Sequence, residues 1–186
     1  MYKKLLKAGL AGGLTLIVWT ILINGFFGFK HRMDMKHVPD EMAVYQILKQ
    51  HIIEPGRYLC NPPLTDSNQF PDNEPVFSIL YAGFGHEAAS PLSEVFSLLI
   101  AIVTATICAF LLSFASERIL STYPRRVFFV FLIGLLITFF SDSAKYGIGS
   151  YPLSDTLIIA VHNIIRWTVL GAVIGLIVKP ESKKNV

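Results

Sequence analysis

Charged residues are scarce in this sequence and unevenly spread. Asp, Glu, Lys and Arg make up 16% of its 186 residues, whereas a soluble domain carries about 25%. Residues 8–29, 95–116 and 127–141 contain no charge, and residues 156–178 contain only Arg166. A membrane core about 30 Å thick is crossed by about 20 apolar residues in a helix. The shortage of charge therefore excludes an ordinary soluble domain and predicts a polytopic α-helical membrane protein.

Cysteines and motifs of known chemistry are also scarce. Cys60 lies in a polar loop and Cys108 within an apolar stretch, so no disulfide is expected between them. The net charge of +3, without a long basic run, gives no indication of a nucleic-acid partner. The sequence has no G-x-S-x-G turn, phosphate-binding loop, H-E-x-x-H or paired-cysteine motif. It therefore assigns no catalytic residue, no metal site and no cofactor.

The third apolar stretch is short, because its 15 uncharged residues cover only about 22 Å at 1.5 Å per residue. A span is needed here all the same, because without it the basic C-terminal tail would lie opposite the other basic loops. We therefore predict that this helix continues through Asp142 and Lys145. Gly147 and Gly149 then end it, which places both charged side chains at the outer membrane boundary.

Basic residues gather on one side of the four predicted spans. That side has nine lysines and arginines against two acids, whereas the other side has six against eleven. The nine are Lys3, Lys4, Lys7, Arg118, Arg125, Arg126, Lys179, Lys183 and Lys184. Because cytoplasmic loops carry the excess of such cations, both termini are predicted to be cytoplasmic. The first span is interpreted as an uncleaved signal anchor, because its apolar stretch is too long for a secretory signal.

The loop between the first two spans is predicted to be a small extracytoplasmic domain. Residues 30–94 contain seven of the ten prolines, which mark turns. A helix is expected from about Pro39 to Pro55, because apolar residues repeat there at helical spacing, and strands are expected at 57–60 and 76–81. A unit of this size has too small a core to be stable alone. We therefore expect it to pack on the ends of the spans or on a partner.

The predicted fold class is thus an all-α membrane protein with four transmembrane helices and a small α+β insert. Residues 1–29 form the N-terminal cytoplasmic segment and first helix, and residues 30–92 form the insert. Residues 93–186 form helices two to four and a cytoplasmic tail.

Several short motifs carry a resemblance to known proteins. They are the glycine-rich start with Trp19, the Pro39-Asp40-Glu41 helix start and the Pro55-Gly56-Arg57-Tyr58 turn. With the three later spans, they resemble a group of short, functionally uncharacterised bacterial membrane proteins. This resemblance implies a bacterial inner-membrane location and supplies no catalytic residue.

Arg166 is the strongest candidate for a functional residue, because it lies near the middle of the fourth span. A charge there costs several kcal/mol unless it is paired or hydrated, so it indicates function by default. His162 and Asn163 precede it by four and three residues and form one polar stripe with it. The alternative is a structural polar clamp between helices. We predict an Asp142–Arg166 ion pair, or a link between them through His162.

Histidines could also indicate a metal or haem site. A haem ligand at His162 would need a partner His or Met on a facing helix, and the first three spans have neither. His31 and His37 flank Asp34, but this pattern is more typical of a solvated face than of a metal site. No metal or cofactor is therefore expected.

Two glycine pairs predict close helix contacts. Gly9 and Gly13 form one pair and Gly171 and Gly175 another, each at a spacing that lets backbones approach closely. Both pairs lie in the cytoplasmic halves of their spans. We predict that the first and fourth helices touch there, through Gly13 and Gly171 or Gly175.

These observations favour a structural role over chemistry. The first hypothesis is an accessory or assembly subunit of a larger membrane complex, contacting protein partners through the insert. The second is a small transporter or permeation element using the polar stripe, and the third is a membrane-embedded enzyme. The expected partners are the lipid bilayer and other proteins of the complex, without nucleic acid.

Overall fold

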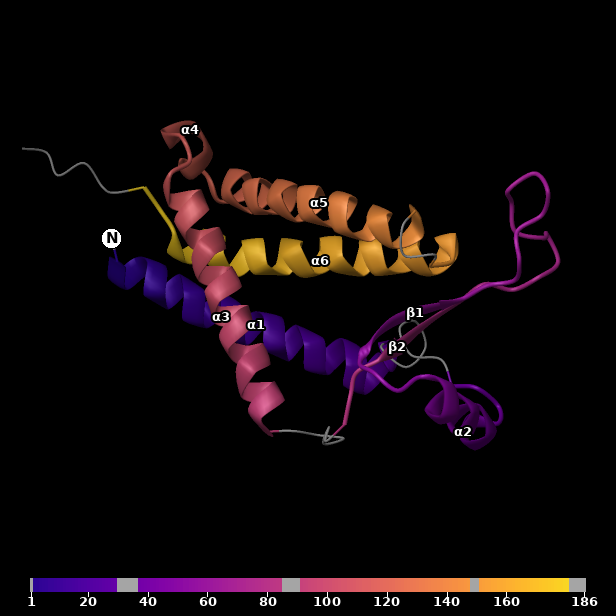
Figure 1. Cartoon of the computed structure of the whole chain (residues 1–186). Coiled ribbons are helices and arrows are strands. Elements are labelled where there is room, and N and C mark those ends of the chain that lie inside the picture. Colours follow the sequence, from indigo (N-terminus) through magenta and orange to yellow (C-terminus); the bar gives the residue numbers. More distant parts are fainter. Residues whose placement is uncertain (1, 30–36, 85–90, 148–150, 181–186) are drawn as a thin grey trace, which may run out of the picture. The chain divides into compact units, whose positions relative to one another are not determined.

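The computed structural model describes residues 2–29, 37–84, 91–147 and 151–180. Its elements are helices α1 (Tyr2–Phe27), α2 (Glu41–His51), α3 (Pro91–Ser113), α4 (Glu117–Leu120), α5 (Tyr123–Gly147) and α6 (Leu153–Ile177), with strands β1 (Gly56–Cys60) and β2 (Phe77–Tyr81) (Figure 1). The chain divides into two compact units, Met1–Lys36 with Pro91–Val186 and His37–Ser90.

Four helices of the first unit, α1, α3, α5 and α6, are long and apolar enough to cross a membrane. This confirms the predicted number of apolar helices. The shortest, α3, has 23 residues and extends about 34 Å, more than the hydrocarbon core requires. Helix α5 continues past Asp142 and Lys145 to Gly147, as the short third stretch predicted. The four-residue α4 was not predicted.

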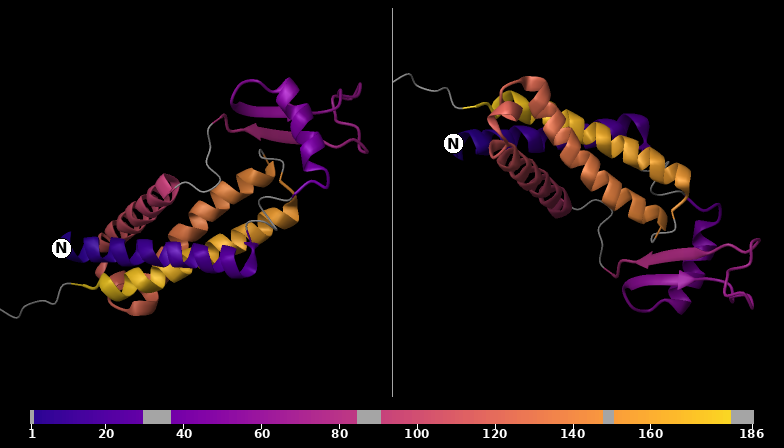
Figure 2. Two further views of the ribbon diagram at one scale, coloured as in Figure 1. Left: turned by 90° about the horizontal axis from the view of Figure 1, so that it is seen from below. Right: turned by 90° about the horizontal axis from the view of Figure 1, so that it is seen from above.

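The long helices pack in the order α3, α1, α6, α5, and each is antiparallel to its neighbours (Figures 1 and 2). Helices α5 and α6 form one extensive contact and α1 and α3 another, while α1 and α6 join the two pairs. Helix α3 crosses α1 steeply and touches α5 and α6 only slightly (Figure 1). Helix α1 therefore carries most of the packing that holds α3.

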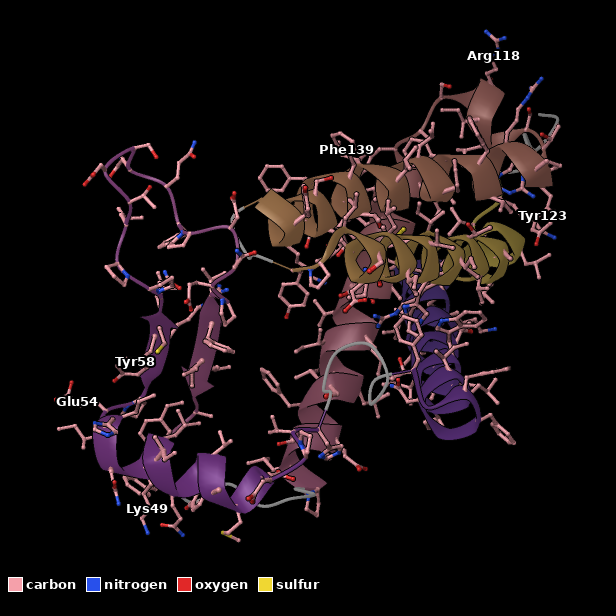
Figure 3. The ribbon with its side chains drawn as sticks, turned by 90° about the vertical axis from the view of Figure 1, so that its right-hand side faces the viewer. Lys49, Glu54, Tyr58, Arg118, Tyr123 and Phe139 are labelled. Atoms are coloured by element: carbon pink, nitrogen blue, oxygen red, sulfur yellow. The ribbon has the colours of Figure 1, made fainter. Side chains whose placement is uncertain are left out.

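Small side chains fill the contact between α1 and α3. Ala8, Ala105 and Ala109 are fully buried there, which lets the two backbones approach closely. Large apolar side chains point outward instead, as Phe139 does from α5, with 73% of its surface exposed (Figure 3). Such a surface is costly in water and is suited to lipid.

The second unit is one helix and one antiparallel hairpin. Asp40 caps α2, because its carboxylate accepts a hydrogen bond of 3.2 Å from the backbone N–H of Ala43. In the hairpin, Tyr58 lies opposite Ile79, and the Tyr58 hydroxyl donates to the backbone carbonyl of Glu54 at 2.6 Å (Figure 3). The strands begin within one residue of their predicted starts, and none of the residues described between 37 and 84 is buried.

Candidate functional site: the polar residues of helix α6

The three polar residues near the centre of α6 face three different surroundings. Successive residues of a helix are about 100° apart, so adjacent His162 and Asn163 cannot both face the same neighbour. His162 contacts α1, Asn163 contacts α5, and Arg166 lines a hollow shared with α1 and α3. The predicted polar stripe is therefore not one surface, because its three side chains face three different sets of neighbours.

His162 contacts two aromatic residues, Trp19 within α1 and Phe29 just after it. The indole N–H of Trp19 donates to Nε2 of His162 at 3.2 Å, so this nitrogen is the unprotonated acceptor of a neutral ring. Phe29 stacks on the same imidazole with its ring centroid 4.6 Å away. Gly28 makes this possible, because its φ of 58° bends the chain back after α1.

Asp142 joins α5 to α6 from a fully buried position. Its Oδ2 accepts a hydrogen bond of 2.8 Å from the side-chain amide of Asn163. Its Oδ1 makes no hydrogen bond with any described residue but lies 3.0 Å from Nζ of Lys145, so this second contact is an ion pair without hydrogen-bond alignment. Only 1% of Asp142 is exposed, so these two partners must offset the cost of burying its charge.

Arg166 points into a hollow of about 440 Å³ between α1, α3 and α6. It lies thirteen residues after Leu153, about 20 Å along a helix of about 37 Å, and so near its middle. The hollow's hydroxyl groups come from Thr20, Ser97 and Thr104. Thr20 and Ser97 already donate to carbonyls of their own helices. Among the residues that the structure describes, none forms a hydrogen bond or ion pair with the Arg166 guanidinium.

The predicted Asp142–Arg166 ion pair is absent from the structure, and so is a link between them through His162. Asp142 instead accepts a hydrogen bond from Asn163 of α6 and pairs with Lys145 of its own helix, α5. Arg166 is turned toward α1 and α3, and His162 bonds to Trp19. The prediction was wrong because it used depth in the membrane alone, whereas rotation about the helix axis decides which helix each side chain meets.

The glycines predicted to join the first and fourth helices also face other helices than expected. A Cβ added at Gly13 would lie 2.7 Å from the Cα of Ile102 on α3, and one at Gly9 would collide with Thr106. Gly171 and Gly175 face Val130 and Arg126 of α5 instead of α1. Helices α1 and α6 do touch, but at Gly12, where a Cβ would lie 2.9 Å from Leu170.

Sequence reasoning missed Arg126, which was counted only as a loop cation. It is 6% exposed, and its Nε donates to the carbonyl of Gly175 at 2.8 Å. Its Nη1 donates to the carbonyl of Leu120. These carbonyls end α6 and α4, where the helix dipole is negative. No local sequence signal connects Arg126 to Gly175, because 49 residues separate them.

The described residues contain no group of three or more His, Cys, Asp or Glu side chains placed to hold a metal ion. His31 and Asp34 lie outside the described residues, and His37 lies 3.5 Å from Glu41 on an exposed surface. The hollow beside α6 places the Arg166 guanidinium near hydroxyl-bearing side chains, an arrangement that attracts an anion electrostatically.

Comparison of the chain with known protein families, curated proteins and solved structures gave no match.

Proposed function

We propose that the chain is a multi-pass protein of the bacterial inner membrane that serves as an accessory or assembly subunit of a larger membrane complex. The four apolar helices support membrane insertion, and the bias of lysine and arginine supports cytoplasmic termini. The resemblance to short bacterial membrane proteins supports the location. In this arrangement His37–Ser90 is extracytoplasmic.

Arg166 is the observation that carries the proposal. A guanidinium in the middle of a spanning helix is costly unless a partner or water satisfies it. Asp142 is already committed to Asn163 and Lys145, so it does not neutralise Arg166. A partner helix that places a carboxylate in the hollow would supply the missing charge and would fill the space beside α3. Arg166 is thus the point at which a second subunit binds.

The exposed surface of the second unit also supports the proposal of a protein partner. None of its described residues is buried, and apolar side chains on both strands, Leu59 and Leu80, are 73% and 77% exposed. A hairpin and one short helix are only marginally stable unless another surface covers their apolar side chains. The insert therefore provides a second contact with the same complex.

The stability of the isolated protein tests this role for Arg166. Arg166→Met keeps the apolar stem and removes an uncompensated charge, so the purified protein should be as stable as wild type or more stable in a detergent melt. A structural clamp predicts the opposite, a clear loss of stability. Arg118→Met is the matched control, because Arg118 points away from α4 into solvent (Figure 3).

Partner binding is measured by photo-crosslinking in native membranes. A photoreactive phenylalanine analogue at Thr104, inside the hollow, should give one discrete cross-linked protein, and Arg166→Met should abolish it. The same analogue at Val103, on another face of α3 and 48% exposed, should not give that product. A Thr104 product that persists in the Arg166→Met background contradicts the assigned role of Arg166.

A small permeation element remains the second candidate, because Thr20, Ser97, Thr104 and Arg166 line one hollow that suits an anion. Purified protein in liposomes distinguishes the two. Anion flux that requires Arg166, without any added subunit, supports permeation and contradicts the accessory role.

A further inference from the structure

A second pocket of the first unit lies where the start of α1 meets the ends of α3, α4 and α6. It has a volume of about 180 Å³ and is formed by the start of α1, the end of α3, α4 and the residues after α6. Figures 1 and 2 show these ends gathered on one side of the first unit. The pocket does not include Arg166, so it is a different site from the hollow.

Two lysines from distant parts of the chain line this pocket. Lys4 comes from the first turn of α1 and Lys179 follows α6. Neither makes an ion pair or hydrogen bond with another described residue. The lining also includes the apolar side chains of Leu5 and Val178, which are buried in the core, with only 7% and 5% of their surfaces exposed. Two unpaired cations thus lie beside a buried apolar surface.

The two lysines are not needed to neutralise the negative C-terminal ends of the nearby helices. Helices α3, α4 and α6 all end here, and their carbonyls attract cations. Other groups already serve several of those carbonyls: Arg126 donates to Leu120 and Gly175, and the Ser113 hydroxyl donates to Phe110. Within the part of the chain that the structure describes, Glu117 is the one acid near this end. An excess of positive charge therefore remains.

The volume and the lining define the class of ligand. Pockets for drug-sized ligands measure about 300–1,000 Å³, so this one is too small for a nucleotide or an organic cofactor. A phosphate group fits, and the apolar wall suits the start of an acyl chain. Basic pockets between helices on the cytoplasmic side are typical sites for anionic lipid head groups.

We propose that Lys4 and Lys179 bind the phosphodiester of an anionic phospholipid in the cytoplasmic leaflet. The lipid bridges the first turn of α1 and the residues that follow α6. This proposal rests on the membrane placement of the proposed function, but not on a protein partner or on Arg166. Free phosphate shares the head-group chemistry and lacks the acyl chains, so the test compares both.

The experiment titrates the full-length protein in neutral detergent and measures binding by native mass spectrometry. The probes are phosphatidylglycerol, phosphatidylcholine and inorganic phosphate. We expect saturable binding of phosphatidylglycerol at one site and no comparable binding of the other two. Each of Lys4→Gln and Lys179→Gln should weaken it about fivefold, the effect of about one lysine at an anionic membrane surface.

Lys3→Gln provides the matched control. Lys3 is adjacent to Lys4 on α1 but does not line the pocket, so its loss should leave the affinity within twofold of wild type. Equal weakening by Lys3→Gln and Lys4→Gln would overturn the proposal, since it would indicate a diffuse basic surface. Phosphate competing as well as the lipid would overturn it too. Neither result depends on a partner subunit, so failure here is distinct from failure of the accessory role.

Discussion

Arg126 and Arg166 show two ways in which a cation is accommodated within one helix bundle. Arg126 is nearly fully buried, but its guanidinium donates to the carbonyls that end α4 and α6. These carbonyls are short of donors in every helix, so Arg126 supplies what they lack and is itself satisfied. Arg166 lies in the middle of α6, where every carbonyl has its own helical donor. The same side chain is therefore structural at one position and open to a partner at the other.

The contact between Asp142 and Asn163 is a pairwise interaction that can be measured. Hydrogen bonds between membrane helices average about 0.6 kcal/mol and reach about 1.7 kcal/mol. The ionised acceptor and its burial place this contact at the upper end. Asp142→Asn and Asn163→Ala should each destabilise the protein, and the double variant should recover about 1–2 kcal/mol of the summed loss. Thermal melts in detergent with a double-mutant cycle measure this coupling.

Asp142 and Arg166 provide the comparison cycle. The two side chains face different helices, so the effects of Asp142→Asn and Arg166→Met should add within about 0.5 kcal/mol. A large coupling in this cycle, together with none between Asp142 and Asn163, would mean that Asp142 has the wrong partner in the structure.

At this scale the sequence identifies the residues but not their partners. Arg166, His162, Asn163 and Asp142 stand out because polar groups in apolar stretches are conspicuous. Their partners depend on helix rotation, which a sequence without pronounced amphipathic faces does not define. Trp19 illustrates this limit, since nothing local connects it to a histidine 143 residues later.

The contact between α1 and α3 is set by glycines that leave no room for a side chain. Gly13→Ala would place a Cβ 2.8 Å from the backbone N of Ile102, which cannot move without shifting α3. Overpacking of this kind costs about 1–3 kcal/mol and outweighs the gain in helix propensity of about 1 kcal/mol. We expect a lower melting temperature in detergent for Gly13→Ala.

Gly25→Ala is the control for this substitution. Gly25 lies in the same helix, and no heavy atom lies within 4 Å of its added Cβ. The change should leave the protein unaffected or slightly more stable, because alanine is the better helix former. Equal destabilisation by both alanines would show that the effect comes from α1 itself and not from its contact with α3.

Helix extents were predictable because a membrane requires a minimum length and excludes charge. Charges bound the apolar stretches, and the caps and prolines around α2 mark its ends. Crossing angles and neighbours were not predictable in the same way. Glycines occur on several helices, and which pairs meet depends on the packing of all the helices together.

Charge asymmetry is the property of the whole molecule that decides its orientation. Seven cations of the first unit's described part lie at the end of the bundle where α1 begins and α6 finishes: Lys3, Lys4, Lys7, Arg118, Arg125, Arg126 and Lys179. Moving such a group across a bilayer is unfavourable, which is why we propose that this end lies on the cytoplasmic side. The second unit would then be exported with the turn between α5 and α6.

The two cysteines allow this orientation to be tested with little change to the protein. Cys60 is exposed in β1 and Cys108 is buried in α3, so Cys60 is the accessible thiol of the pair. A membrane-impermeant maleimide should label wild-type protein in sealed spheroplasts and should not label Cys60→Ser. Arg118→Cys in the Cys60→Ser background places a thiol on α4, and it should react only after lysis. Labelling of Arg118→Cys in sealed spheroplasts, with Cys60 protected until lysis, would reverse the orientation and place the lysine pocket on the outside.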